Sequence, residues 1–318
     1  MPRGYVALTL LCIACSKSAP EHPGHGDAAL EAGPILVEER SIDAGDVELF
    51  VRRRGPSSAK QSVVLLHGGP ALSSRYMRVL EDLATTDRAI ISFDQRGTGA
   101  SSVPKAAAFA MDDFVADVEA VRSAENADRI VLLAHSWGGL IAWAYTAKYM
   151  KNVEALVFVG ALAPTKPPND EARTRLLQKV ASLQSAGKIP KPLPAPIGDD
   201  CMPAVLAVSP AYFHDPGFAL PEDLRRTTCN QATSNATNEA VFFPGYDYSA
   251  ALAYTGPVHI AFGESDPLGV ALGQHIQTAL NKTTASLQVI PAAGHSPWFE
   301  AQNTTHDGIS SFLGQPPP

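Results

Sequence analysis

One serine lies between a buried strand and a helix, in a setting that activates a hydroxyl as a nucleophile. Residues 130–139 read IVLLAHSWGG, an apolar run followed by Ser136 and an apolar helical stretch. The backbone at the apex of such a tight turn is strained, so the residues two before and two after it must be small. Here they are Ala134 and Gly138. The following helix N-terminus directs free N–H groups at an oxyanion formed on the serine. We therefore predict that Ser136 is a catalytic nucleophile.

Two later segments contain the base and the acid that such a serine needs. His295 lies in PAAGHSPW, after the last apolar run, and Asp266 lies in FGESDP, after the preceding run. A serine needs an imidazole to accept its proton, and the imidazole needs a carboxylate to fix its tautomer. Glu264 is the competing carboxylate in the same loop. We predict a triad of Ser136, Asp266 and His295.

A glycine-rich loop supplies the second donor of a predicted oxyanion hole. Residues 63–70 read VVLLHGGP, an apolar run that ends in His67 and two glycines. Glycine lets a backbone N–H approach a substrate without side-chain obstruction. We predict that the N–H groups of Gly69 and Trp137 hold the oxyanion, and that His67 supports the loop by hydrogen bonding.

The elements that must position these residues alternate along the chain. Helical periodicity follows residue 73 and recurs over 112–121 and 140–149. Strands alternating with helices predict an α/β fold with a mainly parallel sheet, helices on both faces and two antiparallel leading strands. The eight apolar runs that predict strands are 35–39, 47–51, 63–66, 89–93, 130–134, 155–159, 258–262 and 287–290.

One long segment interrupts this alternation. Residues 164–248 are rich in proline and polar residues, with helical periodicity over 171–184 and no convincing buried strand. Insertions after a strand's carboxyl end lie over the ligand crevice of a parallel sheet. We therefore predict a helical cap at 164–248, inserted after the sixth strand, and a core formed by 34–163 and 249–318. Cys201 and Cys229 lie in this segment and form a candidate disulfide if the protein is exported; two unrelated buried thiols are the alternative.

The first residues predict a targeting segment. Residues 1–15 read MPRGYVALTLLCIAC, and the apolar run at 5–14 is too short to span a bilayer of about 30 Å. The run ends at Cys15 before a polar stretch, which resembles a bacterial lipoprotein signal whose cysteine receives lipid. We expect a signal peptide at 1–15, a flexible tether at 16–33, and an exported, membrane-anchored lipoprotein of a bacterial cell envelope. An ordinary signal peptide and a periplasmic or secreted protein are the alternative.

Charge and composition exclude several classes of partner. The 318 residues carry a net charge of −7, with no run of five or more basic residues. Nucleic-acid binding needs clustered cations, so we expect no nucleic-acid partner. The expected partner is a small-molecule or short-peptide substrate, with membrane contact only through the lipid anchor. The predicted chemistry requires no metal or organic cofactor.

Five motifs together resemble the proline iminopeptidase-like branch of the α/β-hydrolases. They are HGGP, DQRGTGAS, AHSWGG, GESD and GHSPW, within roughly residues 45–315. The resemblance implies the α/β-hydrolase fold, the triad order serine, aspartate, histidine, and release of N-terminal residues from small peptides or amides. It also implies cap glutamates that bind the substrate's free amine; Glu239 matches one such position and Glu222 is a second candidate. Ala71 departs from the family, which has glycine after HGGP.

Two other functions stay open. A carboxylesterase or lactonase would use the same triad on short acyl esters. A non-catalytic, surface-tethered binding protein would leave Ser136 unreactive.

Overall fold

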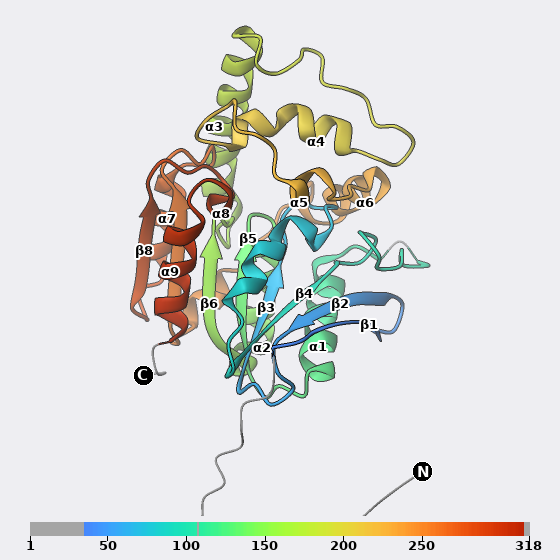
Figure 1. The fold of residues 1–318 in the computed structure, drawn as a ribbon, viewed down its shortest axis with the longest axis vertical. Coiled ribbons are helices and arrows are strands. Elements are labelled where there is room, and N and C mark those ends of the chain that lie inside the picture. Colours follow the sequence, from blue (N-terminus) through green and yellow to red (C-terminus); the bar gives the residue numbers. More distant parts are fainter. Residues whose placement is uncertain (1–34, 107, 315–318) are drawn as a thin grey trace, which may run out of the picture. The chain divides into compact units, whose positions relative to one another are not determined.

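Eight strands form one sheet in the computed structural model, which describes residues 35–106 and 108–314 (Figure 1). Their order across the sheet is β1-β2-β4-β3-β5-β6-β7-β8. The pairs β1/β2 and β2/β4 are antiparallel, and all later pairs are parallel. The prediction of a mainly parallel sheet with an antiparallel start is therefore confirmed. The strands are β1 (Val37–Asp43), β2 (Glu48–Arg54), β3 (Gln61–Leu66), β4 (Arg88–Phe93), β5 (Ile130–His135), β6 (Val153–Val159), β7 (Val258–Gly263) and β8 (Ala285–Ile290).

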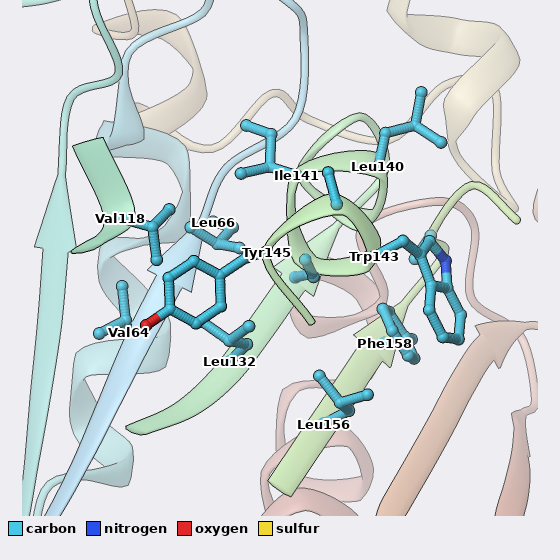
Figure 2. Packing of buried hydrophobic residues seen from close by; sticks show 14 of the residues in the cluster. Val64, Leu66, Val118, Leu132, Leu140, Ile141, Trp143, Tyr145, Leu156 and Phe158 are labelled. Atoms are coloured by element: carbon cyan, nitrogen blue, oxygen red, sulfur yellow. The ribbon is translucent and has the colours of Figure 1, made fainter. Parts of the chain in front are cut away.

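Alternate side chains of the central strands enter two hydrophobic cores. Val64 and Leu66 of β3 pack on the side of α1 (Met111–Ala124), α2 (Gly138–Tyr149) and α7 (Val270–Ala279). Figure 2 shows this packing around α2, where Tyr145 and Leu132 lie close to Val64. Val63 and Leu65 pack on the other side, against the 3₁₀ helix η1 (Ser74–Leu83) and α9 (Gln302–Leu313). Helices on both faces, as predicted, keep both sides of the parallel strands dry.

Two elements differ from the sequence prediction, and polar residues are involved in both. The first strand covers Val37–Asp43 instead of 35–39, because its pairing with β2 continues through Glu38, Arg40 and Asp43. The helix after residue 73 is a 3₁₀ helix. Its flanking Ser73 makes no side-chain cap; the Ser73 hydroxyl accepts a hydrogen bond from the N–H of Thr228 instead.

The segment after β6 is helical, which confirms the insertion expected there. In Figure 1 its helices lie beyond the carboxyl ends of the parallel strands. The longest, α3, runs through the predicted helical stretch and begins earlier, with two prolines in its first turn, where their missing N–H groups cost nothing. The helices from here to β7 are α3 (Lys166–Ser185), α4 (Met202–Val208), η3 (Ser209–Tyr212), α5 (Glu222–Arg225), α6 (Gln231–Thr237), η4 (Asn238–Phe242) and η5 (Ser249–Ala253).

Two short elements complete the chain: η2 (Met150–Asn152) before β6, and α8 (Pro297–Glu300) before α9. The expected signal peptide at 1–15, with Cys15, and the expected tether at 16–33 lie outside the described residues. Within the part of the chain that is described, no helix combines the length and hydropathy needed to cross a bilayer.

Candidate active site

Ser136 occupies a strained turn between β5 and α2. Its φ of 54° lies in the left-handed region, which costs a non-glycine residue about 1–3 kcal/mol. The turn packs so tightly that a Cβ on Gly138 would lie 2.2 Å from the carbonyl oxygen of Leu66. Such a conformation persists only where its surroundings enforce it, and it exposes the serine hydroxyl at the carboxyl end of the sheet.

His295 and Asp266 form a buried acid–base pair. The Nδ1 of His295 lies 3.0 Å from Asp266 Oδ2 and 3.1 Å from Oδ1, and both residues are 5% exposed. Asp266 Oδ1 also accepts a hydrogen bond from the N–H of Leu268. The competing carboxylate, Glu264, points elsewhere and accepts from the N–H of Ala292. Asp266 is therefore the group that orients the imidazole.

Two backbone N–H groups near Ser136 are available to an oxyanion. Among the described residues, no protein acceptor receives a hydrogen bond from the backbone N–H of Gly69 or from the backbone N–H of Trp137. Gly69 lines the same cavities as Ser136 and His295, and Trp137 follows the serine directly. Backbone donors fixed in this way stabilise developing negative charge without reorganisation.

Gln95 braces both donors from the loop after β4. Its N–H donates to His67 Nε2 (3.0 Å), and its side-chain amide donates to the His67 carbonyl (2.9 Å). Its amide oxygen accepts from the Trp137 indole N–H at 2.9 Å. Burial lowers the pKa of His67, so the ring stays a neutral acceptor. This is the supporting role predicted for His67.

Two cavities meet at the reacting groups and differ in charge. Both are lined by Gly69, Ser136, Tyr212 and His295. The smaller, about 340 Å³, has no aspartate, glutamate, lysine or arginine in its lining. The larger, about 530 Å³, is lined by Lys166, Asp170 and Arg173 of α3. We call them the neutral cavity and the charged cavity.

Comparison with known proteins shows which sequences and folds the chain is similar to. The sequence pattern of the alpha/beta hydrolase fold family matches residues 61–186. A proline iminopeptidase of Lactobacillus delbrueckii subsp. lactis is 34% identical over 137 residues, which cover 42% of this chain and 47% of the relative. The match thus spans about half the length of that relative.

Solved structures match over most of the chain. The proline iminopeptidase of Mycobacterium smegmatis has a TM-score of 0.66 at 21% identity, covering 87% of this chain and 97% of its own. An esterase from Exiguobacterium antarcticum has a TM-score of 0.64 at 20% identity, covering 87% and 100%. The chain has the α/β-hydrolase fold. In sequence it resembles the proline iminopeptidases, and these likenesses support a hydrolase of this family.

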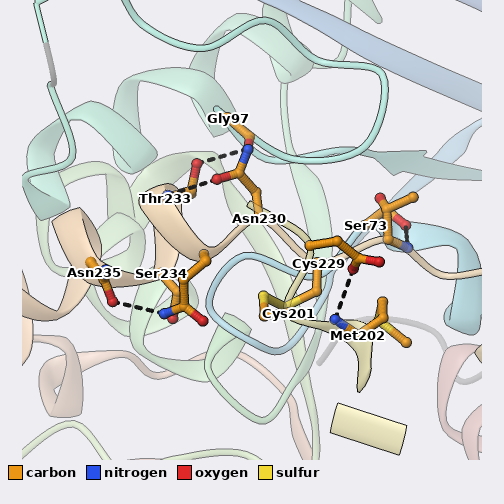
Figure 3. The surroundings of a disulfide bond; sticks show 12 residues. Ser73, Gly97, Cys201, Met202, Cys229, Asn230, Thr233, Ser234 and Asn235 are labelled. Atoms are coloured by element: carbon orange, nitrogen blue, oxygen red, sulfur yellow. Dashed lines mark hydrogen bonds between the residues drawn. A yellow bond between two sulfur atoms is a disulfide. The ribbon is translucent and has the colours of Figure 1, made fainter. Parts of the chain in front are cut away.

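A disulfide between Cys201 and Cys229 (Figure 3) forms part of the lining of the neutral cavity. It joins the start of α4 to the segment before α6. The carbonyl of Cys229 also accepts a hydrogen bond from the Cys201 N–H (3.3 Å). The two cysteines singled out in the sequence therefore pair, and they do so beside the reacting centre.

The structure does not bring Glu222 and Glu239 to that centre. Both are exposed, and neither lines the neutral or the charged cavity. Glu222 forms an i,i+4 ion pair with Arg226 at 3.2 Å on the surface of α5. Asp170, one turn along α3 from Lys166, is the carboxylate that lines the charged cavity instead.

Sequence reasoning also missed Tyr212, which lines both cavities. Its carbonyl accepts a hydrogen bond from the His295 N–H at 2.7 Å, so the cap holds the loop of the base. Burial, and then the charge of Asp266, raises the pKa of Tyr212 to about 12. Only Pro210, in the first turn of its short helix, marked this segment, so no local pattern pointed to the residue.

Proposed function

We propose that the protein is a serine hydrolase that works through an acyl-enzyme. The observation that carries the proposal is the buried His295–Asp266 pair, which shares two cavities with Ser136 at its strained turn. A carboxylate on Nδ1 leaves the other ring nitrogen, Nε2, as the proton acceptor, which is the form a general base needs.

The chain's own residues account for each proton in this reaction. His295 Nε2 removes the Ser136 hydroxyl proton as Oγ attacks the substrate carbonyl carbon, and Asp266 stabilises the imidazolium. The N–H groups of Gly69 and Trp137 bind the oxyanion. In comparable sites each such donor stabilises the transition state by about 3 kcal/mol. His295 then gives its proton to the leaving group. Water, activated by the same imidazole, releases the acyl group and restores Ser136.

We propose a proline iminopeptidase-like aminopeptidase that releases N-terminal residues from small peptides or amides. The similar proteins that carry the name proline iminopeptidase support this substrate class. A free ammonium in a partly desolvated site needs an opposite charge. Asp170 in the charged cavity is the carboxylate available for it.

A carboxylesterase or lactonase is the second candidate, and the neutral cavity favours it. A cavity with no charged lining suits an apolar acyl group. The two candidates differ in whether the substrate's amine contributes to binding.

A substrate panel separates them. We expect hydrolysis of proline anilide to exceed that of N-blocked proline anilide and of short acyl esters, with all turnover lost in Ser136→Ala. Faster turnover of short esters than of proline anilide would instead identify an esterase. Turnover that survives in Ser136→Ala would refute the serine mechanism.

We also propose that the protein is exported and anchored by lipid on Cys15. The Cys201–Cys229 disulfide supports an oxidising compartment, where such bonds persist. Labelling with a radioactive fatty acid that is lost in Cys15→Ser would support the anchor, and equal labelling of the variant would refute it.

A further inference from the structure

A chain of three buried hydrogen bonds joins the oxyanion loop to the loop that carries the base. The N–H of Gly68 donates to the hydroxyl oxygen of Tyr76 at 2.6 Å. That hydroxyl lies 2.7 Å from His135 Nδ1, and His135 Nε2 lies 3.0 Å from the backbone carbonyl oxygen of His295. Gly68 precedes the predicted oxyanion donor, and His135 precedes the nucleophile. This series of hydrogen bonds therefore runs beside the oxyanion donor, the nucleophile and the base.

Only one arrangement of protons satisfies these contacts. The carbonyl of His295 can only accept, so His135 carries its proton on Nε2 and accepts on Nδ1. The Tyr76 hydroxyl accepts from Gly68 and therefore donates to that Nδ1. Burial raises the pKa of Tyr76, and it lowers the pKa of His135 well below its usual value, so both groups stay uncharged. With both nitrogens engaged, His135 is not a competing base.

The linked groups contact one another closely at one wall of the neutral cavity, which Gly68, Tyr76 and His135 line. Tyr76 and His135 are 2% and 3% exposed, and the rings of His135 and His295 lie 4.6 Å apart between centroids. Trp298 packs edge-on against His135 at 4.8 Å. A Cβ on Gly68 would lie 2.9 Å from both the Ser136 Cβ and the Tyr76 hydroxyl. A shift of any one of these groups is therefore transmitted to the others.

We propose that Tyr76 and His135 are positioning residues that hold the Gly69 oxyanion donor and the His295 base in register on either side of Ser136. This inference rests on the proposed serine hydrolase function. Neither side chain accepts or releases a proton during the reaction. Because both act on groups whose placement matters most in the transition state, their loss lowers kcat and leaves KM nearly unchanged.

Tyr76→Phe is the direct test, because it removes one hydroxyl and keeps the ring. The best substrate of the panel is used, after Ser136→Ala has been shown to abolish its turnover. We expect kcat to fall roughly tenfold to a hundredfold, the range expected when a buried donor and acceptor lose their partner, with KM within about twofold. Tyr145→Phe is the matched control. It also removes a buried tyrosine hydroxyl, which donates to Glu119 in the contact between α1 and α2, outside both cavities.

A second pair of variants covers the case in which Tyr76→Phe does not fold. His135→Gln places an amide near the former Nε2 and keeps a donor for His295. His135→Asn places its amide near the former Nδ1 and keeps only the Tyr76 side. We expect both to lose kcat, with His135→Gln recovering more, because it still holds the base loop.

The outcomes are distinct. A kcat for Tyr76→Phe and for both His135 variants within twofold of wild type would overturn the inference and leave the proposed function intact. Equal loss of kcat in Tyr145→Phe, or a loss expressed as raised KM, would also overturn it, because the effect would then be one of general stability or of binding. A wild-type protein that turns over no ester or anilide would overturn both proposals.

Discussion

At the scale of single residues, the proposed recognition of a free amine depends on Asp170. It lines the charged cavity and pairs with Lys166 at 2.6 Å. A substrate ammonium would share this carboxylate, so Asp170→Asn should raise KM for proline anilide roughly tenfold, about 1.4 kcal/mol. KM for the N-blocked analogue should stay unchanged. Steady-state kinetics on the two substrates measures the difference.

Glu239→Gln is the matched control, because Glu239 is exposed and lies outside both cavities. It should leave both KM values unaltered. A selective loss in Glu239→Gln instead of Asp170→Asn would contradict the assignment. Equal effects of Asp170→Asn on both substrates would mean that Asp170 does not bind the substrate's amine.

These acids also mark the limit of prediction from sequence. Ser136 follows a buried strand directly, and Asp266 and His295 lie in the loops after β7 and β8, so local pattern and chain order indicate them. The acid that recognises a substrate depends on which face of a cap helix points inward, and the cap helices show weak periodicity. Glu239 and Glu222 were chosen by resemblance and by position along the chain, which does not encode that face.

At the scale of elements, the cap is joined to the oxyanion loop along one seam. The N–H of Ser73 donates to the Thr228 carbonyl (2.9 Å), and the N–H of Asn230 donates to the Ala71 carbonyl (3.1 Å). The Cys201–Cys229 disulfide then ties α4 to this seam. It closes a loop long enough to stabilise the fold by roughly 3 kcal/mol. The seam thus fixes one wall of the neutral cavity.

Removing the disulfide should loosen that wall. The double variant Cys201→Ala/Cys229→Ala should lose roughly 3 kcal/mol in the free energy of unfolding by urea. Its KM should rise several-fold with a smaller change in kcat, because the triad lies outside the loop. Dithiothreitol should reproduce the effect on wild type and leave the double variant unchanged. A double variant with wild-type KM and wild-type stability would contradict this role.

The core elements were predictable where burial is continuous, and less so at the edges. β5 and β7 are buried throughout, and β3 is buried after Gln61; all three coincide with apolar runs to within a residue or two. β1 is an edge strand whose mixed polar sequence follows its partner's hydrogen bonds, so its bounds shifted. The element after Ser73 is a 3₁₀ helix, and Ser73 itself pairs with Thr228 of the cap; apolar periodicity reports neither.

At the scale of the whole molecule, burial of neutral histidines makes stability depend on pH. Burial lowers the pKa of four histidines, of which His135 shifts most strongly: His67, His135, His259 and His306. In the unfolded chain a histidine titrates near pH 6.5. Below that pH the unfolded state binds protons that the folded state excludes, so the free energy of unfolding should fall as pH drops.

Urea unfolding at pH 7.5, 6.5 and 5.5 measures this dependence. The midpoint should decrease below pH 6.5, because the free energy of unfolding falls by up to about 1.4 kcal/mol per pH unit for each histidine. His135→Gln should flatten the slope by removing one such group. A midpoint that stays constant or rises as the pH falls to 5.5 would contradict the burial of neutral imidazoles.

The proposed hydrolase function depends on Ser136 being an activated nucleophile. Reaction with a fluorophosphonate, followed by mass spectrometry of the digested protein, tests this most directly. We predict one adduct on the peptide that contains Ser136, absent in Ser136→Ala and much slower to form in His295→Gln. A wild-type protein without an adduct, or equal labelling of Ser136→Ala, would contradict the account and favour a non-catalytic binding protein or a different nucleophile.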